Sequence, residues 1–176
     1  MRNPKIQKLA LSAFFCALVF VTTQISVPAP AVGNVNLGDG MLLLCAQILG
    51  GPWAMVAAAV GAALTDLLSA YTVYAPATLV IKACMVAIFL WIAALLSRCK
   101  LPKTAARLIS ALCAELVMIA GYFLYESLLY APLTAALNIP FNAVQGAVAI
   151  ALFAVIYPVL SKTGLLRWLE NDRSHH

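Results

Sequence analysis

Charged residues are scarce in this chain: they make up only 10% of its 176 residues, whereas 64% are hydrophobic. A soluble domain has about a quarter charged residues and about half apolar ones. The scarcity of charge and the mean hydropathy of +0.98 exclude a soluble globular protein and indicate an integral membrane protein. Its apolar runs far exceed the roughly 10-residue strands of a membrane barrel. We therefore expect an all-α membrane protein with one domain over residues 1–176.

Several residue types and motifs that catalysis requires are also missing. Histidine occurs only as His175 and His176, which excludes histidine-based acid–base chemistry. The five cysteines are scattered without a CxxC pair, so we expect no metal site and no cofactor. The chain has no Walker loop with its lysine, no HExxH and no GxSxG. It therefore cannot hydrolyse ATP, and a binding subunit powered by other proteins is the simplest interpretation.

Long apolar stretches, interrupted by glycine and proline, predict the order of the spans. Single spans are expected at 9–27, 77–97, 108–129 and 141–160. The apolar stretch 40–70 would be about 46 Å long as one helix, too long for a hydrocarbon core of about 30 Å. Pro52 follows Gly50 and Gly51, a pattern typical of one helix ending and another beginning. It favours a short helix hairpin at 40–70, although one tilted span is the alternative.

The distribution of basic residues decides between these two topologies. Basic residues flank the cytoplasmic ends of spans. With the hairpin, six transmembrane helices place both termini and the 98–107 loop in the cytoplasm, together with ten of the eleven Lys and Arg residues. A single span would put the four basic residues of that loop outside. We therefore predict six helices with cytoplasmic termini, and the net charge of +5 reflects membrane topology and not a nucleic-acid surface.

Five charged residues are out of place in such a membrane domain. Asp39, Asp66, Lys82 and Glu126 fall in the outer half of the membrane, and Glu115 lies nearer its middle. A charge at this depth costs at least about 2.5 kcal/mol, so it is usually paired or functional. Lys82 is the only basic residue away from the cytoplasmic ends. A structural ion pair between Asp66 and Lys82 would pin two helices together, or Lys82 would face a ligand, and the two roles are compatible.

Other polar residues recur at helical spacing near the outer ends of the last three spans. Thr78 is four residues from Lys82, and Tyr122 lies between Glu115 and Glu126. Asn138, Asn142 and Gln145 form a third stripe, in which Asn138 is alternatively a helix cap and Gln145 an interhelical hydrogen-bonding residue. An Asn-rich loop at 33–39 would cover them. Amides, tyrosines, a threonine and a lysine together suit a pocket for a flat, polar, heterocyclic solute.

The first span carries a different signal. Ala13 and Ala17 form a small-xxx-small pair, which allows close approach of another helix, although alanine is abundant in this chain.

Four segments carry a resemblance to a known family. They are Asn36-Leu-Gly-Asp39, Leu49-Gly-Gly-Pro52, Gly61-Ala-Ala-Leu-Thr-Asp66 and Tyr74-Ala-Pro-Ala-Thr-Leu-Val-Ile-Lys82. Together with the length and the six spans, they resemble the substrate-binding S component of an energy-coupling-factor (ECF) transporter. The branch is riboflavin-type and also includes pyridoxine- and hydroxymethylpyrimidine-type members.

The resemblance implies a function, partners and a site. An S component binds a vitamin or precursor from outside a prokaryotic cell membrane and docks on a membrane coupling protein that carries two ATPase subunits. The family's alanine motif for that docking matches Ala13 and Ala17. The family's pocket lies at the outer ends of helices four to six. Carried over residue by residue, it predicts these substrate-binding residues: Asn36, Thr78, Lys82, Glu115, Tyr122, Asn142 and Gln145.

The resemblance does not fix the substrate. A pyridoxine- or hydroxymethylpyrimidine-type ring is favoured, with riboflavin next. Three other functions stay open at this point: a membrane enzyme using Glu115, Glu126 and Lys82, a stand-alone permease, and a scaffolding protein that binds no ligand.

Overall fold

The computed structural model describes residues 4–29 and 34–162. Its elements in chain order are α1 (Pro4–Gln24), β1 (Ser26–Pro28), β2 (Asn34–Asn36), α2 (Gly38–Ile48), α3 (Gly51–Leu67), the 3-10 helix η1 (Thr72–Tyr74), α4 (Ala75–Leu96), α5 (Lys103–Leu129) and α6 (Pro132–Lys162). The expected all-α fold with six helices and a short helix hairpin is confirmed. The short antiparallel pair β1–β2, in which Val27 is opposite Val35, is an addition that the sequence did not indicate.

Four of the helices, α1, α4, α5 and α6, are long and apolar enough to cross a membrane. The other two are shorter than a full span: the 11 residues of α2 would extend only about 16 Å. The hairpin expected at 40–70 therefore consists of two short helices. Gly50 and Gly51 separate them with φ values of 65° and 60°, a left-handed conformation that glycine adopts readily. Pro52 then occupies the first turn of α3, where its missing N–H is harmless.

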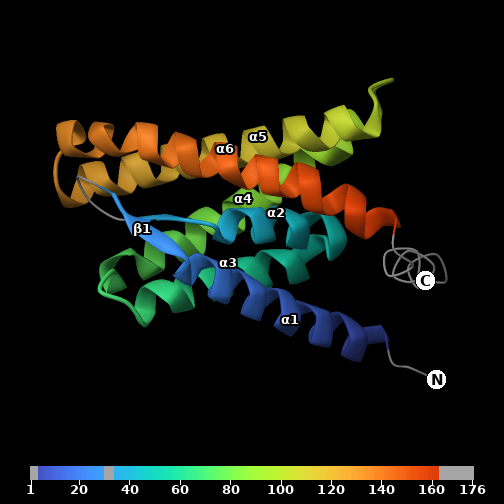
Figure 1. The fold of residues 1–176 in the computed structure, drawn as a ribbon, viewed down its shortest axis with the longest axis horizontal. Coiled ribbons are helices and arrows are strands. Elements are labelled where there is room, and N and C mark those ends of the chain that lie inside the picture. The colour runs from blue at the N-terminus through green and yellow to red at the C-terminus, as the bar shows by residue number, and fades with distance from the viewer. Residues whose placement is uncertain (1–3, 30–33, 163–176) are drawn as a thin grey trace.

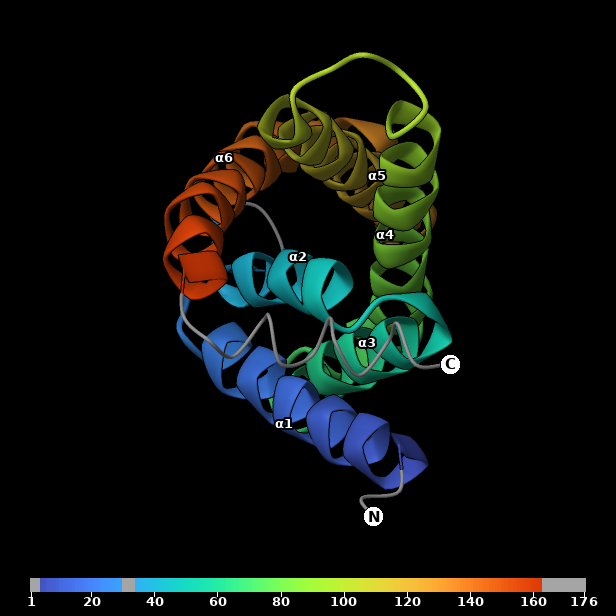
Figure 2. The same cartoon turned by 90° about the vertical axis from the view of Figure 1, so that its right-hand side faces the viewer.

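The short helix α2 lies in the middle of the bundle (Figure 2), where it contacts α1, α3, α4 and α6. Its run Leu42 to Ala46 is at most 2% exposed, because every face of the helix is covered. A helix without a polar face needs such an environment. The outward faces of the surrounding helices carry exposed Leu, Val and Trp side chains, which suits contact with lipid. The polar side chains that the sequence places at membrane depth are instead buried inside.

The start of α1, the connection between α4 and α5 and the end of α6 lie at one end of the bundle (Figure 1). We call this the basic end, because its described cationic residues are Lys5, Lys8, Arg98, Lys100, Lys103, Arg107 and Lys162. The positive-inside rule assigns it to the cytoplasm. The strands β1 and β2 and the α5–α6 connection lie at the opposite, outer end. Arg2, Arg167 and Arg173 lie outside the described residues, as does part of the predicted outer loop.

The sixth helix is longer than the sequence indicated. The span expected at 141–160 begins at Pro132 and continues through Pro140, so the expected outer connection at 130–139 is mostly helical. Proline inside a transmembrane helix is tolerated where neighbouring groups or water satisfy the freed carbonyl. Asn138 consequently lies within α6, and the alternative that it caps a helix is wrong.

Candidate functional site

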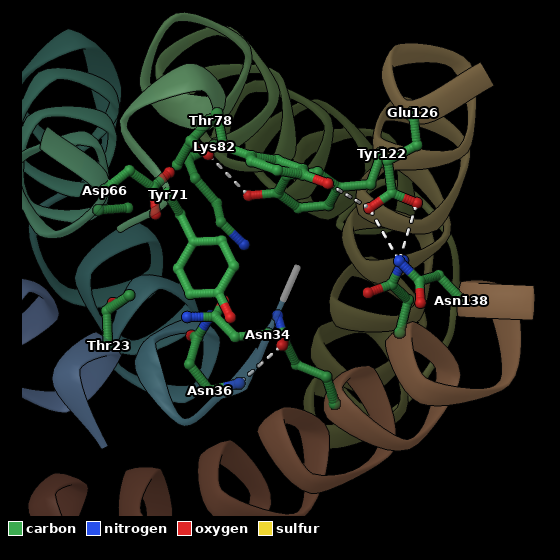
Figure 3. A pocket seen from close by; sticks show the side chains of 14 residues that line it. Thr23, Asn34, Asn36, Asp66, Tyr71, Thr78, Lys82, Tyr122, Glu126 and Asn138 are labelled. Carbon is green, nitrogen blue, oxygen red and sulfur yellow. Dashed lines mark hydrogen bonds between the residues drawn. The ribbon is translucent and has the colours of Figure 1, made fainter. Parts of the chain in front are cut away.

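A polar pocket opens near the outer end of the bundle, and Figure 3 shows the side chains that surround it. They come from α1, β2, α3, α4, α5, α6 and the segment between α3 and α4. The lining residues are Thr23, Asn34, Asn36, Ala62, Asp66, Tyr71, Tyr74, Thr78, Lys82, Tyr122, Glu126, Asn138, Asn142 and Gln145. The cavity left between them has a volume of about 30 Å³. That volume holds about two water molecules, so the side chains nearly fill the pocket in this arrangement.

A buried chain of polar contacts forms one wall. Lys82 on α4 forms an ion pair with Asp39 in the first turn of α2, with Nζ 2.5 Å from Oδ1. Gln145 on α6 donates from Nε2 to the other Asp39 oxygen at 2.6 Å. Its Oε1 accepts the backbone N–H of Asn36 at 2.8 Å. Lys82, Asp39 and Gln145 are each at most 2% exposed, so their charges and amide are satisfied by one another instead of by water.

The local sequence around Asp39 explains how this wall is built. Asn36 accepts the backbone N–H of Gly38 with its side-chain oxygen at 3.0 Å, which shapes the entry to α2. Gly38 packs against Thr23, and a Cβ at this position would lie only 2.0 Å from the Thr23 hydroxyl oxygen. Only glycine fits there. Asp39 follows in the first turn of α2, where the helix dipole favours a negative charge.

Tyrosines and a second carboxylate form an adjoining wall. Tyr122 and Thr78 share a hydrogen bond between their hydroxyl oxygens at 3.0 Å. Glu126 accepts two bonds from the amide of Asn138, at 3.0 and 3.1 Å, and one from the Tyr74 hydroxyl at 3.4 Å. The ring of Tyr122 also lies below the Lys82 ammonium, 5.4 Å from its centroid, within reach of a cation–π interaction. This wall therefore presents aromatic surface whose polar atoms are already held in place.

Three further lining groups have polar or aromatic surface that a ligand could contact. Asn142 is 8% exposed and lines the pocket, and its side-chain amide makes no hydrogen bond within the described part of the chain. Asp66 lies at the edge of the pocket beside Thr78. The ring of Tyr71 extends across the pocket in Figure 3. The free Asn142 amide, the Asp66 carboxylate beside Thr78 and the Tyr71 ring, which packs edge-on against Tyr74, can together recognise a flat solute with donor and acceptor groups.

The structure brings together six of the seven residues predicted to bind substrate: Asn36, Thr78, Lys82, Tyr122, Asn142 and Gln145 all line the pocket. Glu115 does not. It is 2% exposed and packs against Gly146 behind the lining, near enough to Asp39 and Lys82 to interact electrostatically. Its two carboxyl oxygens have no hydrogen-bond partner among the described residues.

The expected ion pair between Asp66 and Lys82 is wrong: Lys82 pairs with Asp39. The two predicted partners line the same pocket without forming an ion pair. Sequence spacing placed Asp39 at the edge of an outer loop, whereas the short helix α2 carries it into the bundle. Because α2 is central, its first turn faces α4 directly.

Sequence reasoning also left several lining residues out of the predicted substrate-binding set: Asn34, Asp66, Tyr71, Tyr74, Glu126 and Asn138. A signal for three of them was present. Asp66, Glu126 and Asn138 are polar residues at membrane depth, and the last two form hydrogen bonds with each other. For Tyr71 and Tyr74 there was none, because tyrosines at the end of a span are equally typical of the membrane interface.

The alanine pair on α1 lies away from this pocket. Ala13 and Ala17 are both exposed, on the face opposite the buried Ser12, Phe15 and Val19. The inner face of α1 packs closely on α3 at Gly61, where a Cβ would lie 2.5 Å from the Cys16 carbonyl oxygen. The exposed alanines are therefore not needed for packing within the bundle.

Comparisons with known proteins agree with this architecture. The family model described as "ECF-type riboflavin transporter, S component" matches residues 3–162. The chain belongs to this family of ECF transporter S components. It is therefore a membrane subunit for the uptake of a vitamin or precursor, and the family does not consist of enzymes, which removes the alternative of a catalyst using Glu115, Glu126 and Lys82.

Two individual proteins are similar to this chain over most of its length. The Thiamine precursor transporter HmpT of Lactococcus lactis subsp. cremoris (strain MG1363) is 29% identical over 169 residues, covering 94% of this chain and 95% of that protein. A solved S component of a bacterial ECF transporter has the same fold, with a TM-score of 0.67 and 22% identity over 89% of this chain and 96% of that one. The similarity in both cases extends over nearly the full length.

Proposed function

We propose that this S component captures a hydroxymethylpyrimidine-type thiamine precursor, a small heteroaromatic ring, at the outer face of a prokaryotic cell membrane. The observation that carries the proposal is the pocket at the outer end, which is lined by tyrosine rings, the free Asn142 amide and the Asp66 carboxylate. The full-length similarity to a thiamine precursor transporter supports the same substrate class.

The chemistry of these lining groups fits an aminopyrimidine. An exocyclic amino group donates to a carboxylate such as Asp66, a ring nitrogen accepts from an amide N–H such as that of Asn142, and the ring stacks on tyrosine. Because the cavity holds only about 30 Å³, the ring enters only if lining side chains move. Tyr71 is the candidate for that movement, since it extends across the pocket from the segment between α3 and α4.

A pyridoxine-type ring has a similar size and is the next candidate. Riboflavin is a further candidate, and the observation that favours it is the description of the matching family model. Its three-ring system and ribityl chain would require a larger displacement of the lining residues than a single ring does.

The proposal includes the partners that provide energy. A membrane coupling protein with two ATPase subunits would dock on the exposed face of α1, where Ala13 and Ala17 leave room for a close helix–helix approach. The basic end then faces the cytoplasm, where ATP is available, and the pocket opens to the other side.

The test is a binding assay on the purified protein in detergent, with hydroxymethylpyrimidine, thiamine, pyridoxine and riboflavin as ligands. A ligand at 100 times its Kd adds about 2.7 kcal/mol to the free energy of unfolding, which raises the melting temperature measurably. We expect the largest shift with hydroxymethylpyrimidine. Asn142→Leu should remove that shift without lowering the melting temperature of the free protein, because the amide has no partner to lose.

Ser127→Ala is the matched control, since the Ser127 hydroxyl donates to the Phe123 carbonyl of its own helix and does not line the pocket. It should bind like the unaltered protein. If pyridoxine or riboflavin raises the melting temperature more than hydroxymethylpyrimidine does, that compound is the substrate instead. If Asn142→Leu binds the ligand as the unaltered protein does, the ligand binds elsewhere.

A further inference from the structure

A second cavity, separate from the outer pocket, lies at the basic end between the first turns of α5 and the last turns of α6. Its volume is about 160 Å³. Its polar lining residues are Arg107, Thr104 and Ser161, and its apolar lining includes Leu108 and Phe153. A cavity lined by a cation and by apolar side chains matches a molecule that combines an anionic group with hydrocarbon.

Arg107 is held in place, and no acidic residue in the described part of the chain forms a salt bridge with it. Its Cζ lies 4.5 Å from the ring centroid of Tyr157, which is 8% exposed. The stacked guanidinium keeps the N–H groups along its edge available for an anion. The acidic residues in the described part of the chain are Asp39, Asp66, Glu115 and Glu126, and none of them lines this cavity.

The start of α5 adds hydrogen-bond donors on the same side. The helix is 27 residues long, and its N-cap, Pro102, provides no side-chain hydrogen bond to the first turn. The backbone N–H groups of that turn therefore lack acceptors within the helix, and the helix dipole makes this end favourable for an anion such as phosphate.

On the α6 side of the cavity, Pro158 has no N–H and leaves the carbonyl of Ala154 without its usual helical donor. Both residues line the cavity. A hydroxyl group on the ligand would satisfy this carbonyl.

The position of the cavity at the basic end indicates that the anion belongs to a lipid headgroup. The basic end is the cytoplasmic end by the positive-inside rule, and the cytoplasmic leaflet carries anionic lipids. Seen from that end, α5 and α6 lie side by side, away from α1 (Figure 2). The cavity is thus at the level of lipid headgroups and on a face of the bundle distinct from the Ala13 and Ala17 pair.

We infer that this cavity binds the headgroup of an anionic glycerophospholipid. Arg107 and the first turn of α5 hold its phosphate, and Leu108 and Phe153 contact the glycerol and the start of the acyl chains. A glycerol headgroup also has a hydroxyl group that can donate the hydrogen bond missing at the Ala154 carbonyl. The site is independent of the vitamin substrate, because it lies at the other end of the bundle.

The experiment is native mass spectrometry of the full chain after detergent exchange, titrated with phosphatidylglycerol or phosphatidylcholine. We expect phosphatidylglycerol to bind in preference to phosphatidylcholine. Arg107→Gln should weaken binding of phosphatidylglycerol about tenfold or more, since a charge-assisted hydrogen-bonding group is lost. The matched control is Arg98→Gln, which removes the same charge from an exposed position at the basic end outside the cavity and should bind nearly as the unaltered protein does.

A second pair of variants tests the cavity without changing any charge. Ala154→Leu fills the cavity and should also weaken binding of phosphatidylglycerol, whereas Ala151→Leu, exposed on the same helix but outside the lining, should not. If Arg107→Gln and Arg98→Gln lose equal affinity for phosphatidylglycerol, the binding reflects general electrostatic attraction and the inference is overturned. Binding of phosphatidylcholine as strong as that of phosphatidylglycerol would overturn it as well. Displacement of the lipid by millimolar inorganic phosphate would also overturn it, because the cavity would then be a site for the free ion.

Discussion

The buried ion pair between Lys82 and Asp39 links two helices that meet at the centre of the molecule. Gln145 completes it by donating to the second Asp39 oxygen, so the pair retains hydrogen bonds although both side chains are at most 2% exposed. Removing one member of a buried pair leaves the other as an uncompensated charge. This cost complicates any substitution of Lys82 intended to test ligand binding alone.

We predict that Asp39→Asn and Lys82→Met each lower the free energy of unfolding by about 3–5 kcal/mol. The double variant should be more stable than either single variant, because no charge is left unpaired. Unfolding in detergent micelles, followed for all four proteins as a double-mutant cycle, measures the coupling. Additive losses in the double variant would show that the pair does not stabilise the bundle.

Glu115 presents the opposite situation, a buried carboxyl group without a hydrogen-bond donor in the described residues. We predict that Glu115→Gln leaves the melting temperature unchanged or raises it, since an unsatisfied buried acid is destabilising. Ligand affinity should stay within about twofold, because the residue does not line the pocket. A calorimetric titration with the substrate measures this, and a loss of affinity similar to that of Asn142→Leu would show that Glu115 reaches the ligand after all.

At the scale of the helix, α1 has one face packed on the bundle and one face exposed. Its inner face packs on α3 at Gly61 so closely that any side chain there would collide with the backbone of α1. Its outer face exposes Ala13 and Ala17. Since the inner face alone attaches α1 to the bundle, the outer face is available to a partner helix.

We predict that the double change Ala13→Leu, Ala17→Leu weakens assembly with the coupling protein and ATPase subunits and leaves ligand binding unaltered. Two leucines fill the space that a close helix–helix contact requires. The control is Ala143→Leu, Ala147→Leu, an exposed pair with the same spacing on α6. Co-purification of the complex measures assembly. Equal assembly of both double variants, or parallel loss of assembly and ligand binding, would contradict this division of α1 from the pocket.

At the scale of the whole molecule, the two ends of the bundle differ in charge and in the cavity that each contains. The outer end holds the polar pocket, and the basic end holds the cationic residues and the second cavity. Lys82, Asp39, Gln145 and Asn36 connect α4, α2, α6 and β2 around the pocket. A ligand bound among them therefore contacts most of the bundle at once.

We predict that vesicles containing this chain alone do not accumulate the substrate, because the sequence has no nucleotide-binding loop. Vesicles that also contain the coupling protein and both ATPase subunits should accumulate it when ATP is supplied. ATPase subunits with the Walker lysine replaced serve as the control. Accumulation by the chain alone would favour a stand-alone permease.

The sequence by itself determined the class of this protein and its topology. Helices are the simplest structures that satisfy their own backbone hydrogen bonds in lipid, so long apolar runs and the position of ten basic residues were enough to predict six helices and a hairpin. The stripes of polar residues at helical spacing likewise predicted which ends of the last three spans converge, since helical periodicity is a local property.

Only the tertiary structure decided how those residues pair. Lys82 selects Asp39 and not Asp66, because the 11-residue α2 lies at the centre of the bundle and turns its first residues towards α4. Glu115 belongs to the same periodic stripe as Tyr122, yet it faces Gly146 behind the pocket. Spacing along a helix gives the face of a residue, whereas the partner depends on the depth and rotation of neighbouring helices, which long-range packing determines.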